Sequence, residues 1–224
     1  MERIQIAGIH DLKEAHCCLE AGVRQLGFPL RLDVHEEDCT VEDAREICLY
    51  LPPDIEKAVI TYLDHAEDIV TLCRRAGMSI VQIHGEIHTR ELLRLKAIAP
   101  DLIIIKSLVV KGENREALLA AVSRWSALVD AFITDTFDPL TGASGATGKI
   151  HNWAVSRALV EHSIKPVILA GGLTPANVAS AIHMVRPWGV DCHTGVEGHD
   201  DRKDGELVRA FVREAEKAFA ELER

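Results

Sequence analysis

The feature that most constrains the fold is a regular alternation of apolar, β-rich runs with amphipathic stretches along 224 residues. The apolar runs, which are typical of strands, cover residues 4–8, 24–30, 57–63, 79–85, 102–110, 131–136, 165–172 and 189–195. Most of them are continuous rather than polar–apolar alternations, as expected for parallel strands that are covered on both faces. Strict alternation of strand and helix therefore predicts a parallel sheet in an α/β fold.

The number of units indicates how the sheet is arranged. No linker, low-complexity tract or change of composition interrupts the series, so we expect a single domain over residues 1–224. About eight strand–helix units in this length favour a closed (β/α)8 TIM barrel, with an open doubly wound sheet as the alternative. In a barrel the chemistry lies at the carboxyl ends of the strands and in the loops that follow them.

Charge and cysteine usage exclude several classes of partner. The net charge of −10 argues against a nucleic-acid surface and against docking onto anionic membranes. The six cysteines show no CxxC pair and no zinc-finger spacing, which is typical of reduced thiols in a cytoplasmic protein. No apolar run is long enough to span a bilayer, and the N-terminus lacks the apolar core of a signal peptide. We expect a cytoplasmic protein that binds neither nucleic acid nor membrane.

Glycine-rich loops follow the last three predicted strands. They contain the sequences "GASGATGK", "AGGLTPANV" and "HTGVEG". Loops of this composition can direct several backbone N–H groups at an oxyanion, whatever the global charge. Barrels often hold phosphate in the turns after strands 7 and 8. The three loops together predict a small phosphorylated, sugar-type ligand.

Titratable side chains end four of the predicted strands. Asp135 closes the apolar run "FITDT", where a carboxylate rarely serves packing. His84 is a second candidate, with a buried core histidine as the alternative interpretation. Lys106 ends "LIIIK", and we favour a strand-end cation over a Schiff-base lysine. His193 lies one pleat period after Asp191, so both should face the same way.

Several segments resemble the phosphoribosylanthranilate isomerase family of tryptophan biosynthesis. They are "IQIAGIHDLKEA", "EAGVRQLGF", "SIVQIHG", "GATGKIHNW", "KPVILAGGLTPANV" and "GVDCHTGVEG", and together they cover most of the chain. The resemblance implies a barrel that needs no cofactor and performs an Amadori rearrangement of an N-linked phosphoribosyl substrate. That reaction requires an acid to open the furanose ring and a base to remove the C2 proton. We expect the chain to be a monomer or a homodimer.

The resemblance also implies roles for residues of this chain. Asp135 matches the aspartate that acts as the acid, and Asp191 lies in the segment beside the ribose. The phosphate is expected on the loops that carry Gly148, Gly171, Gly172 and Gly195.

One departure from the family affects the chemistry directly. The family's first strand carries the cysteine that acts as the base, and Ala7 occupies this position here. Alanine cannot accept a proton, so His10, Cys192 or His193 is needed as a substitute if the reaction is unchanged. We predict a catalytic set of Asp135, His84 and His193, without a metal.

A second departure affects recognition of the aglycone, the group attached to the phosphosugar. The family has a basic Ser-Pro-Arg segment in the loop after the second strand, whereas this loop contains Glu36, Glu37 and Asp38. Arg31 is the nearby cation, and we expect it to bind substrate. An acidic loop would repel anthranilate and suit a neutral or cationic group better, unless it is simply a solvated loop.

Three functions remain open from the sequence. The first is an isomerase of the family type with a displaced base. The second is an aldolase, epimerase or isomerase of another phosphosugar. In one version of this function, His35 and Asp38 would complete a metal site, although their spacing is not a known metal signature. The third is a non-catalytic phosphosugar binder that has lost its base.

Overall fold

A closed barrel of eight parallel strands forms the centre of the computed structural model, which describes residues 3–32, 37–112, 114–136 and 151–223. Neighbouring strands pair in chain order, and β8 closes the barrel against β1. The predicted (β/α)8 barrel is confirmed. The strands are β1 (Ile4–Ala7), β2 (Gln25–Pro29), β3 (Glu56–Thr61), β4 (Ile80–Ile83), β5 (Ile103–Val110), β6 (Ala131–Thr136), β7 (Val167–Leu169) and β8 (Gly189–Cys192).

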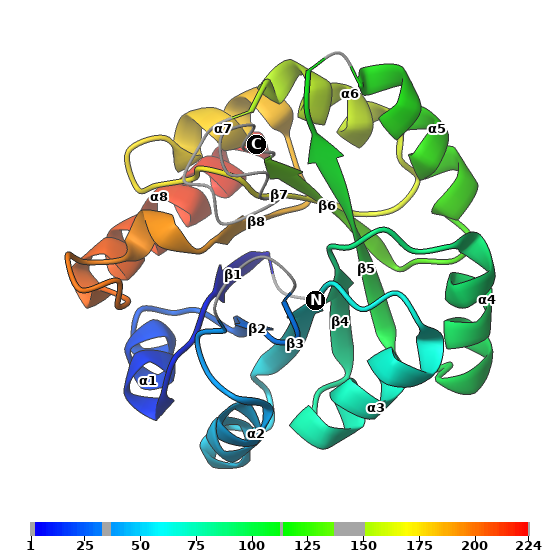
Figure 1. Cartoon of the computed structure of the whole chain (residues 1–224). Coiled ribbons are helices and arrows are strands. Elements are labelled where there is room, and N and C mark those ends of the chain that lie inside the picture. The colour runs from blue at the N-terminus through cyan, green and yellow to red at the C-terminus, as the bar shows by residue number, and fades with distance from the viewer. Residues whose placement is uncertain (1–2, 33–36, 113, 137–150, 224) are drawn as a thin grey trace.

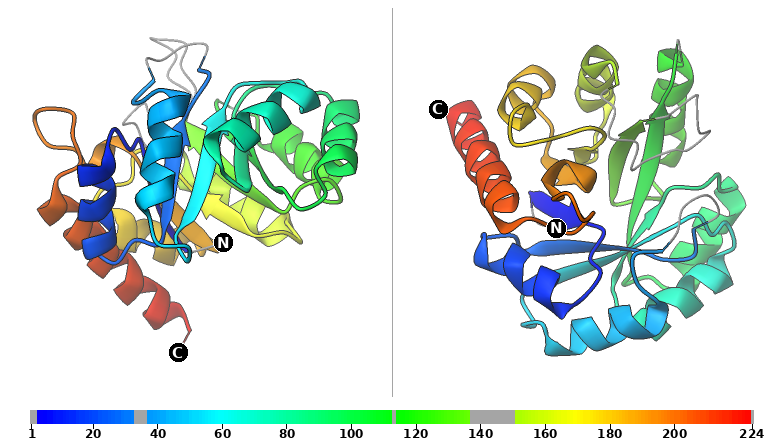
Figure 2. Two further views of the ribbon diagram at one scale, coloured as in Figure 1. Left: turned by 90° about the horizontal axis from the view of Figure 1, so that it is seen from below. Right: turned by 60° about the vertical axis from the view of Figure 1, so that its left-hand side comes forward.

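A ring of helices surrounds the strands (Figure 1). The helices are α1 (Leu12–Glu20), α2 (Val41–Tyr50), α3 (Ala66–Ala76), α4 (Thr89–Ile98), α5 (Arg115–Trp125), α6 (Trp153–His162), α7 (Val178–Val185) and α8 (Gly205–Leu222), with a short 3-10 turn η1 (Thr194–Val196). The last helix, α8, packs against both α7 and α1 and completes the ring (Figure 2). Among the described helices, none is long and apolar enough to cross a membrane.

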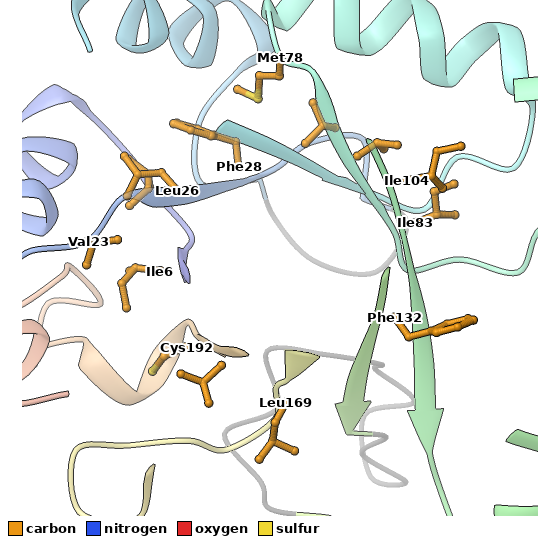
Figure 3. Packing of buried hydrophobic residues seen from close by; sticks show 14 of the residues in the cluster. Ile6, Val23, Leu26, Phe28, Met78, Ile83, Ile104, Phe132, Leu169 and Cys192 are labelled. Carbon is orange, nitrogen blue, oxygen red and sulfur yellow. The ribbon is translucent and has the colours of Figure 1, made fainter. Parts of the chain in front are cut away.

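The apolar residues form two layers. Outward-facing strand residues such as Leu26, Phe28 and Phe132 pack against the helices (Figure 3). A smaller cluster, which includes Ile105 and Ile133, fills the interior of the barrel. The buried members of this interior cluster are aliphatic, which is consistent with the low aromatic content of 4 %. The barrel is therefore a packed core and not a pore.

The start of α7 differs from its prediction. The sequence favours Thr174 as the N-cap with Pro175 at the first helical position, but the helix begins at Val178 and its N-cap is Asn177. The Asn177 side chain accepts from the Thr174 amide at 2.8 Å and donates to the Gly172 carbonyl at 2.9 Å. These bonds fold residues 174–177 into a turn, which delays the helix and fixes the end of the glycine-rich loop.

Candidate active site at the carboxyl ends of the strands

Asp135 and His84, both predicted to be catalytic, meet in the mouth of the barrel. Asp135 Oδ2 lies 2.9 Å from His84 Nδ1, and the side chains are only 4 % and 11 % exposed. The other carboxylate oxygen, Oδ1, accepts from the Thr136 amide at 2.8 Å. The carboxyl group is thus fixed by two contacts, one with the Thr136 amide and one with the imidazole. A carboxyl–imidazole pair in a barrel mouth can take part in general acid–base chemistry on a bound ligand.

The second nitrogen of His84 indicates where a ligand would lie. His84 Nε2 is buried and has no hydrogen-bond partner among the residues that the structure describes. Tyr62 packs beside the imidazole, with ring centroids 6.3 Å apart. A buried polar atom without a partner in a site is typically satisfied by bound ligand or water. His84 therefore has one nitrogen for Asp135 and one for a ligand.

A network of glutamines holds Asp191, the residue expected beside the ribose. Gln5 donates to Asp191 Oδ1 at 2.7 Å, across the pairing of β1 with β8. Gln25 and Gln82 both donate to the Gln5 side-chain oxygen, at 2.5 and 2.7 Å. The three glutamines were not predicted as site residues. The only signal for them is a polar residue inside each of three apolar runs, "IQIAG", "RQLGF" and "SIVQIHG".

Burial raises the pKa of Asp191 to about 6. The hydrogen bond from Gln5 and the charge of His84 oppose this change, and the neighbouring charge of Asp135 adds to it. The three predicted residues Asp135, His84 and Asp191 therefore act on one another electrostatically within one region of the barrel.

His193, the third residue predicted to be catalytic, lies against the end of the first strand. A Cβ placed on Gly8 would lie only 2.0 Å from His193 Nε2, so the imidazole covers the residue that follows Ala7. The same nitrogen faces Glu197 Oε1 at 3.4 Å and Asp38 Oδ1 at 3.8 Å. His193 is therefore next to the position of the missing base, but its Nε2 is directed at carboxylates.

The carboxylates around His193 belong to a larger group, which we call the acidic rim and define as Glu14, Asp38 and Glu197. His10 contacts Glu14 Oε2 at 3.0 Å and Asp38 Oδ1 at 3.5 Å. Lys203 has a side chain that is 0 % exposed, and its ammonium group pairs with Glu197. Burial raises the pKa of Asp38, and the charges of His10 and Lys203 oppose that change.

Cys192, which the sequence left open as a substitute base, does not face the site. Its side chain lies in the apolar layer between strands and helices, as Figure 3 shows. The thiol lies 3.2 Å from the Leu173 carbonyl oxygen. Burial holds its pKa far above the usual range of a thiol. Cys192 is therefore neither directed at a ligand nor ionised at neutral pH.

The two cations singled out from the sequence make their described hydrogen bonds to groups other than Asp135 and His84. Lys106 donates to the carbonyl oxygens of Ile83 and Ser107 at 3.1 and 3.0 Å and lies 5.5 Å from the centroid of the Trp125 ring. Its ammonium group thus faces α5, and burial lowers its pKa to about 8. Arg31 follows β2 with an exposed side chain, and its amide donates to Glu37 at 2.6 Å.

Close packing brings the end of β6 and the loops after β7 and β8 together. Gly171 has a φ of +98°, and a Cβ there would lie 2.1 Å from Thr136 Oγ1. A Cβ on Gly195 would lie 1.8 Å from the Leu173 carbonyl oxygen. These glycines allow the backbones of the loops to approach one another, which a phosphate site built from amides requires. Gly148 lies outside the described residues.

Gly195→Ala is expected to weaken phosphate binding at least about tenfold, which corresponds to roughly 1.4 kcal/mol. The added methyl group would collide with the Leu173 carbonyl oxygen and displace the backbone of one loop. Titration with inorganic phosphate measures the dissociation constant. Gly198→Ala is the matched control, because its nearest neighbour is a flexible Asp200 side-chain oxygen at 3.2 Å. An unchanged constant in folded Gly195→Ala protein would remove this residue from the phosphate site.

The described residues contain no cluster of candidate metal ligands. Within residues 3–32, 37–112, 114–136 and 151–223, no group of three or more His, Cys, Asp or Glu side chains is arranged to hold a metal ion. His35, considered with Asp38 as a metal ligand, lies outside these ranges.

Comparison with protein families and curated sequences gives a consistent result. The family model described as N-(5'phosphoribosyl)anthranilate (PRA) isomerase matches residues 4–214. N-(5'-phosphoribosyl)anthranilate isomerase 2 of Methanosarcina mazei is 34 % identical, over 97 % of this chain and 95 % of that protein. The N-(5'-phosphoribosyl)anthranilate isomerase of Haloferax volcanii is also 34 % identical, over 97 % of this chain and 95 % of its own length.

Comparison with solved structures gives the same family as comparison with sequences. The phosphoribosyl anthranilate isomerase of Thermotoga maritima superposes with a TM-score of 0.81 at 28 % identity, covering 97 % of this chain and 100 % of that one. A phosphoribosyl anthranilate isomerase in complex with reduced 1-(o-carboxyphenylamino)-1-deoxyribulose 5-phosphate superposes with a TM-score of 0.78 at 27 % identity, with the same coverage.

Proposed function

The chain belongs to the N-(5'-phosphoribosyl)anthranilate isomerase family, and from this premise we propose that it catalyses the Amadori rearrangement of N-(5'-phosphoribosyl)anthranilate. The observation that carries the proposal is the Asp135–His84 pair, with Asp135 Oδ2 and His84 Nδ1 2.9 Å apart in the barrel mouth. The pair supports the proposal because it lies at the carboxyl ends of the strands, where the active sites of (β/α)8 barrels are found.

Asp135 is the acid in the proposed mechanism. It gives a proton to the furanose ring oxygen, the bond from that oxygen to C1 breaks, and an iminium forms between C1 and the aglycone nitrogen. A base then removes the C2 proton, and the resulting enolamine tautomerises to the open-chain ketone. His84 Nε2, which has no hydrogen-bond partner among the described residues, contacts a substrate hydroxyl or the leaving ring oxygen.

The loops after the last strands and Arg31 have proposed roles in substrate binding. The backbones at Gly171, Gly172 and Gly195 hold the phosphate, and Gly148 is predicted to join them. Arg31 is the proposed cation for the aglycone carboxylate. The substrate is thus held at its phosphate end by the loops after β7 and β8.

A second candidate substrate is favoured by the acidic rim. Within the rim, Glu14 pairs with Arg202 and Glu197 pairs with Lys203, whereas Asp38 faces the imidazoles of His10 and His193. The Asp38 carboxylate suits a phosphoribosylamine whose aglycone is neutral or cationic better than one that carries a carboxylate. The reaction and the acid would be the same.

The proposal is tested with purified protein and N-(5'-phosphoribosyl)anthranilate generated in the assay. We expect loss of the fluorescence of the anthranilate adduct, formation of the deoxyribulose product, and rescue of a tryptophan auxotroph. Folded protein that shows no turnover and no rescue contradicts the proposal. Tight binding of a reduced product analogue without turnover would then identify a binder, and turnover of a neutral phosphoribosylamine alone would identify the second substrate.

A further inference from the structure

The structure leaves one catalytic group of the proposed reaction unassigned, and the inference that follows rests on that proposed function. Ala7 occupies the end of β1 and has no atom that accepts a proton. Cys192 packs in the apolar layer with its thiol against a carbonyl oxygen. The acceptor of the C2 proton must therefore come from another side chain in the mouth of the barrel.

Asp191 is in a suitable place for this role. It lies on β8, the strand that pairs with β1, and it is in register with Gln5. Gln5 and Ala7 are two residues apart on β1, so their side chains point to the same side of the sheet. Its side chain is only partly buried, and it shares the mouth of the barrel with the acid Asp135 and with His84, whose charges both act on it. The carboxyl group is therefore close to the reacting end of the site and accessible to a ligand.

The partners of Asp191 fix the carboxylate without neutralising it. Gln5 donates to Oδ1 at 2.7 Å, and Gln25 and Gln82 hold the Gln5 side chain in turn. A neutral amide leaves the negative charge in place, whereas a direct ion pair would reduce the basicity of the oxygens. Held through Oδ1, the group retains Oδ2 as the atom that takes a proton.

The charges that act on Asp191 are those of His84, which follows β4, Asp135 on β6 and Lys203 in the segment before α8. Gln5 faces it from β1, and the neighbouring strand β7 is Val167–Leu169, which is entirely apolar. With burial as the dominant effect, the pKa of about 6 leaves the group ionised at neutral pH and more basic than an ordinary aspartate.

We propose that Asp191 is the general base of this protein and accepts the C2 proton in place of the residue that Ala7 cannot supply. The proton moves from C2 to Asp191 Oδ2, the electron pair of the C2–H bond forms the C1=C2 double bond, and the π pair of the C1=N bond moves to the nitrogen. Two carboxyl groups on β6 and β8 then perform the acid and base steps. Of the substitutes predicted from the sequence, His10 contacts the carboxylates of Glu14 and Asp38. His193 remains the rival, and the experiment separates it from Asp191.

The experiment compares wild type with Asp191→Asn, His193→Gln, Ala7→Cys and the Asp191→Asn/Ala7→Cys double variant. We expect Asp191→Asn to lower kcat by about 100-fold or more, with KM for the substrate within a few-fold of wild type. For wild type, kcat should rise with pH through about 6 as the carboxyl group loses its proton. His193→Gln should keep this limb of the profile, whereas Asp191→Asn should lose it.

Rescue distinguishes a base from a structural residue. A thiol placed at Ala7 should restore much of the activity of Asp191→Asn, with the ascending limb of kcat moved to a more alkaline pH, as expected for a cysteine. A structural role of Asp191 would give neither the rescue nor the moved limb. Near-wild-type kcat in Asp191→Asn, or loss of the limb in His193→Gln alone, overturns the proposal. A wild type that turns over no phosphoribosylamine instead overturns the proposed function.

Discussion

Asp135→Asn is expected to lower kcat by about 1,000-fold or more, within the range of a lost general acid. Asparagine is nearly isosteric, and its oxygen can still accept from the Thr136 amide, as Asp135 Oδ1 does at 2.8 Å. The amide cannot give a proton to the ring oxygen, so ring opening loses its acid. Steady-state kinetics with N-(5'-phosphoribosyl)anthranilate measures the effect, with thermal unfolding as a check on the fold.

A matched control separates the lost acid from a general change of charge. Asp101→Asn removes an exposed carboxylate in the loop before β5, at the end of the barrel away from the site, and should leave kcat unchanged. The wild-type phosphate affinity should persist in Asp135→Asn, because the loops after β7 and β8 are untouched. A kcat within tenfold of wild type would mean that Asp135 is not the acid.

Lys203→Met is expected to cost about 3–5 kcal/mol in the free energy of unfolding, the range for breaking a buried ion pair. The ammonium group is completely buried and pairs with Glu197, and the amide of Lys203 donates to Glu14 at 3.0 Å. Methionine keeps the apolar length of the side chain but leaves the Glu197 carboxylate without its cation. Urea denaturation at neutral pH measures the loss.

The acidic rim also sets the pH dependence of that loss. The loss of stability in Lys203→Met should become smaller as the pH falls, because burial raises the pKa of Asp38 and Lys203 opposes that change, so protonation of Asp38 removes a partly buried charge that has lost this cation. Arg157→Met is the control: it breaks an exposed i,i+4 pair with Glu161 on α6 and should change stability much less. Equal losses of the free energy of unfolding in Lys203→Met and Arg157→Met would show that burial of Lys203 adds nothing to the stability that its ion pair provides.

The fold and the positions of Asp135 and His84 in the barrel mouth could be predicted from the sequence because each depends on local signals. Apolar runs and amphipathic stretches indicate parallel strands and covering helices one segment at a time. Asp135 and His84 end such runs, and the barrel topology alone then brings the ends of β4 and β6 to the same mouth.

The partners within the site could not be predicted, because they depend on register between distant strands. A single glutamine in an apolar run has no visible partner until β1, β2, β4 and β8 are aligned. The direction of Cys192 likewise follows from the pleat of β8, which turns Asp191 inward and its neighbour outward. The start of α7 was misplaced because the Asn177 side chain bonds back to Thr174.

The bond between Gln5 and Asp191 has a consequence for how the chain reaches its active form. The two residues are 186 positions apart and come from the first and last strands. A contact between such distant positions requires a large loop to close, and loop closure of this kind is slow. During synthesis, β8 is made last, so the carboxylate of Asp191 is fixed only when the final strand docks onto the first. Docking of the last strand and assembly of the site are therefore one event, and a nascent chain that lacks β8 has no complete site.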